Sequence, residues 1–127
     1  MIEIKDETEK VILVGVALSD QDDTKESLEE LKDLVSTAGA ETAGMLIQNR
    51  EQQHPATYVG KGKIEELKNM IWELRATGIV CDDELSPAQM KNLQDELDVK
   101  VMDRTLIILD IFAARASTSE GKIQVEL

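Results

Sequence analysis

The stretch Val11-Ile-Leu-Val-Gly-Val-Ala-Leu18 is an apolar run that no charged or polar side chain interrupts. A short run of this kind, without alternation between apolar and polar residues, is typical of a strand that is covered on both faces. Such strands occur mainly in parallel sheets that have helices on either side. The run therefore predicts a central strand of an α/β domain.

A helical pattern follows this run. Apolar side chains recur at helical spacing from Leu28 to Ala38. Asp23 and Glu26 stand three residues apart, which is the spacing of a capping box, and Gly39 is suited to end the helix. We therefore expect an amphipathic helix that packs on the first strand.

The alternation of strand and helix continues along the chain. Ser86 and Pro87, with Gln89 placed to complete a capping box, are a strong start for the third helix. Four strands alternating with four helices predict an α/β fold, a four-stranded and mainly parallel sheet flanked by helices in three layers. For the strand order we predict 2-1-3-4. The expected strands are residues 11–18, 41–48, 79–81 and 99–102, and the expected helices are residues 24–38, 64–77, 87–97 and 106–116.

Three expectations concern burial and boundaries. Trp72 lies off the apolar line of its helix, and we expect it at the edge of the core. Residues 106–116 are apolar almost all round, so we expect this helix to be well buried. Ser117 and Glu120 are spaced to cap a new helix that stops after a few residues. The expected organisation is a tail at 1–10, an α/β domain at 11–116 and the truncated start of a helical linker at 117–127.

Composition excludes several classes of protein. The chain has 127 residues, of which 42% are hydrophobic and 31% charged, as in a single globular domain. Its formal net charge of −12 argues against broad docking on a phosphate backbone, and 2% aromatic residues leave too few for base stacking. The single cysteine, Cys81, excludes an intrachain disulfide and is expected to be a core thiol. Without a signal peptide or a membrane-spanning run, we expect a cytoplasmic protein with no stable membrane insertion.

The best candidate for an anion-binding site is Gly60-Lys61-Gly62-Lys63, at the point where the second helix is expected to begin. A helix N-terminus offers unpaired N–H groups and partial positive charge, glycine allows close approach, and two lysines add cations. The motif is not a Walker A loop, because Ile64 follows the last lysine where serine or threonine would be needed. The alternative is a solvated loop whose lysines serve solubility.

A second cluster, Asp82-Asp83-Glu84, follows the third strand at the edge where open α/β sheets carry their sites. Asp82 and Asp83, with Asp103 from the next strand end, could form a weak Mg²⁺ site. The alternative, which we favour, is that these aspartates cap and turn the chain and pair with Arg104.

Two arginines, Arg104 and Arg115, flank the last helix and complete the set of candidate anion- or RNA-binding residues. Arg104 could meet either a nearby acid or a phosphate. The single histidine, His54, has no serine or cysteine nucleophile assignable to it, so we assign no catalytic residue and expect His54 to be a turn residue.

Three stretches together resemble the N-terminal domain of the HflX-type translational GTPases, and the likeness covers the chain from about residue 10 to the end. The stretches are Pro55-Ala-Thr-Tyr-Val-Gly-Lys-Gly-Lys-Ile-Glu-Glu-Leu67, Asp82-Asp-Glu-Leu-Ser-Pro-Ala-Gln-Met-Lys-Asn-Leu93, and Asp103-Arg-Thr-Leu-Ile-Ile-Leu-Asp-Ile-Phe-Ala-Ala-Arg115 running into Glu120-Gly-Lys-Ile-Gln-Val-Glu-Leu127. The resemblance implies an α/β N-terminal domain, then an antiparallel helical segment and a Ras-like GTPase domain. It also implies binding to the large ribosomal subunit and its rRNA, in a protein that splits or rescues ribosomes under stress.

The resemblance maps the family's motifs onto Gly60–Lys63, onto Asp82–Pro87 and onto Asp103–Thr105. GTP and Mg²⁺ are then expected in the GTPase domain, with no cofactor and no catalysis in this part of the chain. Residues 117–119 are neutral, whereas the family often carries basic residues there, so the resemblance assigns no RNA contact to that corner.

Two other functions stay open. A purine nucleotide could bind at the strand ends near Lys61, Asp82, Asp83 and Arg104, or the acidic surface could make the domain a protein–protein adaptor. A nucleotide titration would test the first, and co-purification of a basic partner would support the second.

Overall fold

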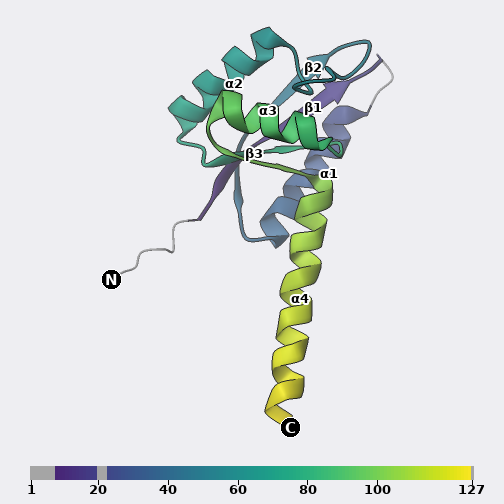
Figure 1. Cartoon of the computed structure of the whole chain (residues 1–127), viewed down its shortest axis with the longest axis vertical. Helices are drawn as coiled ribbons and strands as arrows, with labels where there is room; N and C mark the ends of the chain where they lie inside the picture. The colour runs from purple at the N-terminus through teal and green to yellow at the C-terminus, as the bar shows by residue number, and fades with distance from the viewer. Residues whose placement is uncertain (1–7, 20–22, 127) are drawn as a thin grey trace.

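The computed structural model of the chain describes residues 8–19 and 23–126, and in the last helix it describes side chains as far as Arg115. Strands and helices alternate throughout, as the sequence predicts (Figure 1). The elements are β1 (Lys10–Ala17), α1 (Thr24–Thr37), β2 (Glu41–Asn49), α2 (Lys61–Leu74), β3 (Gly78–Cys81), α3 (Pro87–Leu97), β4 (Lys100–Asp103) and α4 (Arg104–Glu126).

The four strands form one sheet with the order β2-β1-β3-β4, and every neighbouring pair is parallel. This order confirms the prediction. Since the strands are parallel, the residues that follow β1, β2, β3 and β4 all lie at one edge of the sheet, the carboxyl edge. The candidate motifs at residues 60–63, 82–84 and 103–104 therefore share that edge.

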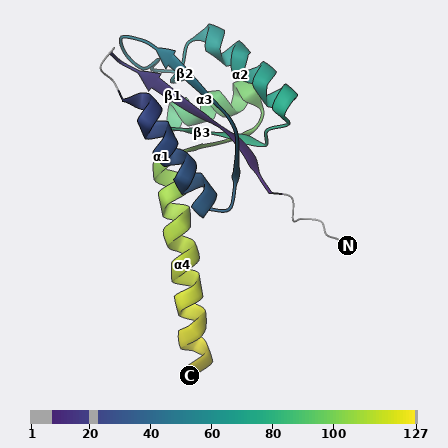
Figure 2. The same cartoon turned by 180° about the vertical axis from the view of Figure 1, so that it is seen from behind.

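Helices cover both faces of the sheet, so the domain has the three layers expected. The face under α2 and α3 holds one core cluster, which includes Ile12, Val14 and Ile79. The face under α1 and α4 holds a second cluster, which includes Val11, Leu13 and Val80. Figure 1 shows α3 in front of the sheet, and Figure 2, from behind, shows α1 in front.

Strand β1 explains why the opening apolar run has no polar alternation. Residues 11–14 are fully buried, and they alternate between the two core clusters. Gly15 continues the run because a Cβ there would lie 2.7 Å from the methyl group of Thr24 in α1. The position leaves no room for a larger side chain.

The helix ends confirm one predicted cap and contradict another. At the start of α3, the Gln89 N–H donates to Ser86 Oγ at 3.1 Å and the Ser86 N–H donates to Gln89 Oε1 at 2.9 Å, which is the predicted capping box. Asp23 does precede α1, but its side chain accepts no capping hydrogen bond, so the capping box predicted with Glu26 is wrong. Its φ of −99° and ψ of 38° lie outside the extended conformation that capping residues usually adopt.

Helix α4 differs most from the sequence prediction. It is one helix of 23 residues, whereas we expected a helix over 106–116 and a new one after Ser117. It is also not buried all round, because Leu109 is 56% and Phe112 61% exposed, while Ile107 packs in the core. Figure 1 shows the reason: only the first turns of α4 lie against the domain, and the helix then runs away from it. The capping side chains expected at 117–120 lie outside the described side chains.

Two further burial expectations have clear outcomes. Trp72 is 84% exposed, so its predicted place at the edge of the core is wrong. Cys81 is fully buried in β3, as predicted. In the part of the chain that the structure describes, no helix is long and apolar enough to cross a membrane.

Candidate anion-binding site

Helix α2 begins at the carboxyl edge with an N-terminus that is open to solvent. Gly60 is its N-cap, with no side chain to cap the helix, and its own N–H donates to Gln48 Oε1 of β2 at 2.7 Å. The first intrahelical bond runs from the Ile64 N–H to the Gly60 carbonyl at 3.0 Å. The N–H groups of residues 61–63 therefore have no protein acceptor among the described residues, as is usual in the first turn of a helix.

Three cationic side chains surround this N-terminus. Lys61 is exposed and makes no ion pair with any described residue. Lys63 pairs with Glu66 one turn along at 3.0 Å, a contact that is open to solvent and therefore weak. The third cation is Arg50, whose Nη1 would lie 2.8 Å from a Cβ placed at Gly60.

Sequence reasoning missed Arg50, because nothing in its sequence position reports its nearness to Gly60. Its Nε donates to the Gln52 carbonyl at 2.9 Å, which holds the guanidinium beside the start of α2. Gly60 leaves the space that the guanidinium uses, and apart from the helix's own backbone no atom of the described residues lies within 4 Å of the place where a Cβ of Gly62 would be. A phosphate could therefore approach the backbone at Gly62 closely.

The loop from Arg50 to Gly60 is tied down by hydrogen bonds rather than free. His54 Nδ1 accepts from the N–H groups of Ala56 at 3.1 Å and Thr57 at 3.3 Å, so His54 is a turn residue, as expected. Two side chains of α3 reach this loop: Gln89 Nε2 donates to the His54 carbonyl at 2.9 Å, and Asn92 Nδ2 donates to the Ala56 carbonyl at 3.0 Å.

Tyr58 anchors the loop in the protein interior. Its side chain is fully buried, and its hydroxyl donates to Asp83 Oδ2 at 2.6 Å. Burial raises the pKa of the Tyr58 phenol far above its usual range, and the hydrogen bond to Asp83 raises it further. The phenol is therefore a permanent hydrogen-bond donor.

Arg104 is held by protein groups. Its Nη2 lies 2.8 Å from Asp82 Oδ1 and also donates to the carbonyl and the hydroxyl of Ser27 in α1. The structure thus shows the pairing with a nearby acid that the sequence left open. Arg115 is exposed on α4, eleven residues further along, which is about 16 Å at about 1.5 Å per residue.

The three aspartates proposed as weak metal ligands each have a protein partner. Asp82 accepts from Arg104, and Asp83 accepts from Tyr58. Asp103 accepts from the Leu85 N–H at 2.8 Å and, at the first turn of α4, from the Leu106 N–H at 2.9 Å. Among the described residues, no three acidic, histidine or cysteine side chains are placed to hold a metal ion. A cation bound here would compete with these partners for the carboxylate oxygens.

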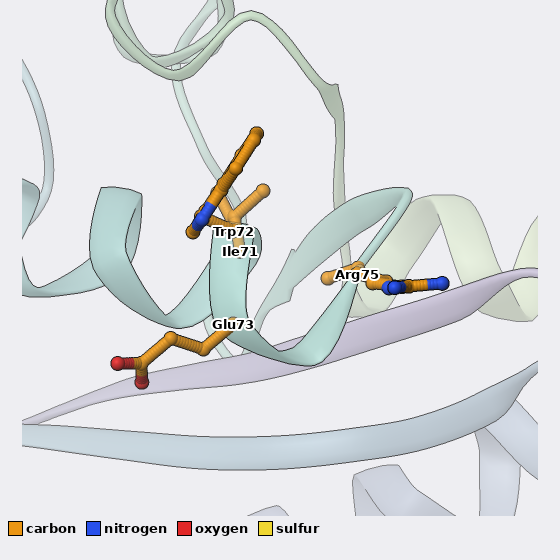
Figure 3. Close-up of a pocket in the computed structure, with 5 residues that line it drawn as sticks. Ile71, Trp72, Glu73 and Arg75 are labelled. Carbon is orange, nitrogen blue, oxygen red and sulfur yellow. The ribbon is translucent and has the colours of Figure 1, made fainter.

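A shallow depression lies at the other end of α2, about 20 Å from Gly60 at about 1.5 Å per residue. It is lined by Ile71, Trp72, Glu73, Arg75 and Ala76. Figure 3 shows the Trp72 ring standing away from the helix and the Arg75 side chain extending past its end. The depression is separate from the candidate anion site.

Comparison with known proteins identifies the family. The family described as GTP-binding GTPase N-terminal matches residues 25–113. Over all 127 residues the chain is 66% identical to a protein named GTPase HflX from Lacrimispora saccharolytica and 42% identical to one of the same name from Escherichia coli. It covers 30% of the length of each of these relatives.

Solved structures show the same fold. The structure titled as a complex of SsGBP and GDP matches 94% of the chain with a TM-score of 0.66 and 25% identity, and the chain covers 33% of it. A GTP-binding protein from Sulfolobus solfataricus in complex with GDP matches 84% of the chain with a TM-score of 0.60 and 23% identity, and the chain covers 30% of it. The chain therefore belongs to the family of GTP-binding GTPase N-terminal domains and corresponds to the N-terminal part of the GTPases named HflX.

Proposed function

We propose that this domain is a non-catalytic module that docks an HflX-type GTP-binding protein on the rRNA of the large ribosomal subunit. In this proposal the helical and GTPase domains of the longer protein are its intramolecular partners. GTP and Mg²⁺ bind in the GTPase domain, and docking modulates the splitting or rescue of ribosomes in the cytoplasm. Membership in the family supports a role within an HflX-type GTP-binding protein. The start of α2 supports a contact with the phosphates of rRNA.

The observation that carries the proposal is the open N-terminus of α2. Three N–H groups and the Lys61 ammonium, which have no partner among the described residues, lie with the nearby Arg50 at the carboxyl edge. In a chain with a net charge of −12, this local concentration of positive charge is suited to one or two phosphates rather than to a long stretch of backbone. Most of the contact area with rRNA is then supplied by other parts of the protein.

The nucleotide alternative has less support from the geometry. It requires Arg104 to reach a phosphate, whereas Arg104 is held between Asp82 and Ser27. A titration of the full-length protein carrying a disabled GTPase site with ATP or GTP and Mg²⁺ tests this alternative, and a saturable thermal shift would support it over the rRNA proposal.

The main experiment compares two charge reversals of equal size in the full-length protein. Lys61→Glu/Lys63→Glu changes the proposed site, and the control Lys32→Glu/Lys91→Glu changes two exposed lysines on α1 and α3. Binding to purified large ribosomal subunits is measured across a salt series.

We expect the site variant to bind at least about tenfold more weakly and to lower the salt slope by about two, since each lost phosphate contact lowers it by about one. The control should bind nearly as the wild type does. Equal weakening by both variants would show only a general charge effect, and unchanged binding by the site variant would reject the proposal.

A further inference from the structure

Tyr58 adopts a backbone conformation that a bulky residue rarely takes. Its φ is 69°, in the left-handed region, where glycine or asparagine is the usual residue. A strained residue persists only when its surroundings hold it firmly, and such residues cluster at functional sites. The strain at Tyr58 therefore indicates that its side chain makes contacts that a glycine could not supply.

The left-handed turn lets the chain make a tight loop while the Tyr58 ring enters the core. The Tyr58 N–H and carbonyl pair with the carbonyl and N–H of His54 at 2.9 and 3.1 Å. The ring is fully buried in the core cluster shared by α2 and α3, and its hydroxyl reaches Asp83. Glycine could make the same turn but would supply neither the ring nor the hydroxyl.

The two residues that follow Tyr58 lead directly into the candidate site. Val59 is fully buried, and Gly60 is the N-cap of α2. Gly60 donates to Gln48 of β2, whereas Tyr58 donates to Asp83, two residues beyond the end of β3. The start of α2 is thus attached to two separate strands of the sheet.

We propose that Tyr58 is a positioning residue for the anion site, which through its hydrogen bond to Asp83 holds the first turn of α2 in the orientation that binds a phosphate. This inference rests on the proposed function. It gives Asp83 a role apart from metal binding, and it explains why a tyrosine occupies a position that favours glycine.

The alternative is that Tyr58 only fills the core, and Tyr58→Phe separates the two. This variant keeps the ring and removes only the hydroxyl. Asp83 is half-buried, so water can replace the lost donor and the fold should persist. A core-filling role predicts wild-type binding for Tyr58→Phe.

The test uses the full-length protein and purified large ribosomal subunits. We expect Tyr58→Phe and Asp83→Ala each to weaken binding about fivefold to tenfold, which corresponds to the net contribution of about one ordinary hydrogen bond. The double variant should be no weaker than either single variant, because both remove the same contact. Asp83→Asn, which keeps an acceptor oxygen, should restore most of the binding.

Hydrogen exchange supplies a readout that does not depend on RNA. In Tyr58→Phe we expect faster exchange at the N–H groups of Tyr58 and Gly60, which bond to His54 and Gln48, with unchanged exchange in β1. Unchanged exchange at these two groups, or wild-type binding by Tyr58→Phe while Lys61→Glu/Lys63→Glu binds weakly, would overturn the inference. If the lysine variant also binds normally, the proposed function fails, and the exchange result alone decides whether Tyr58 holds the loop.

Discussion

Asp82 and Asp83 are consecutive in the chain, yet their carboxylates bind groups on opposite faces of the sheet. Asp82 accepts from Arg104 at the start of α4, and Asp83 accepts from Tyr58, which belongs to the core under α2 and α3. The two residues form a bend directly after β3, and their carboxylates point to different layers of helices. Asp82 and Asp83 thus connect both layers of helices, through hydrogen bonds, to the segment that follows the central strand β3.

Breaking the contact between Asp82 and Arg104 should destabilise the domain. The Asp82 side chain is only 9% exposed, so Arg104→Met would leave a nearly buried carboxylate without its partner. We expect a loss of about 1–3 kcal/mol in the free energy of unfolding, measured by urea denaturation. The double variant with Asp82→Leu should lose less than the sum of the single variants.

The control for that prediction is Lys91→Met. Lys91 and Asp95 form an ion pair whose side chains are 75% and 64% exposed. Its removal should change the free energy of unfolding by no more than about 0.5 kcal/mol. Equal losses for Lys91→Met and Arg104→Met would mean that the contact with Asp82 contributes no more than a surface pair.

Gly62 and Gly78 should respond to alanine in opposite directions. A Cβ at Gly78 would lie 2.7 Å from the Lys100 carbonyl oxygen of β4, and backbone in a paired strand cannot easily move away. Gly78→Ala should therefore lower the free energy of unfolding by about 1–3 kcal/mol. Gly62→Ala should raise it by up to about 1 kcal/mol, because the site is helical and open. Chemical denaturation of both variants checks these signs.

Gly62→Ala also separates stability from binding. The added methyl group stands where we propose that a phosphate approaches the first turn of α2, so binding to the large subunit should weaken although the fold becomes more stable. A variant that is both more stable and fully active in binding would mean that no close backbone approach occurs at Gly62.

Cys81 should make the domain less stable in alkaline solution. Burial raises the pKa of the Cys81 thiol well above its usual range, and the neighbouring aspartates raise it further. The unfolded chain releases this proton near pH 8.5–9 while the folded chain keeps it, so stability is complete below that pH and falls as pH rises. Between pH 7.5 and 10 we expect a loss of about 1–2 kcal/mol.

Cys81→Ala identifies the source of that loss. This variant will be less stable at neutral pH because of the small cavity, but its free energy of unfolding should change less between pH 7.5 and 10 than that of the wild type. Thermal or urea unfolding at both pH values gives the comparison. Identical pH dependence in the two proteins would assign the alkaline loss to other groups.

Loss of the capping box of α3 should lower the free energy of unfolding by a modest amount. Ser86→Ala removes the acceptor for the Gln89 N–H and should lower the free energy of unfolding by about 1 kcal/mol. Ser86→Asp keeps an acceptor and should retain most of that stability. A thermal melt of the three proteins should place the aspartate variant between the wild type and the alanine variant, nearer to the wild type.

The sequence predicts much of this fold because its signals are local. The uninterrupted apolar residues of β1 report burial on two faces, and Ser86, Pro87 and Gln89 act within a single helical turn. The predicted strand order is also correct, although no residue of the sequence indicates an order of strands. The position of Gly60–Lys63 at a helix start follows from the same local signals.

The residues that surround the candidate site were harder to predict because their roles depend on distant contacts. Tyr58 and Asp83 are 25 positions apart, and no composition or spacing indicates their hydrogen bond. Arg50 approaches Gly60 only because of the shape of the intervening loop. The burial of α4 was predicted wrongly because apolar composition does not show where a helix leaves the domain that it starts on.

Because α4 is long, its orientation at the first turn decides where its far end lies. Its 23 residues correspond to about 34 Å at about 1.5 Å per residue, and only the first turns are packed against the domain. A tilt of about 10° at Arg104 would therefore displace the far end by about 6 Å. The hydrogen bonds of Asp103 and Arg104, together with the packing of Ile107, hold the start of α4, and a small local shift there would produce a larger displacement at its far end.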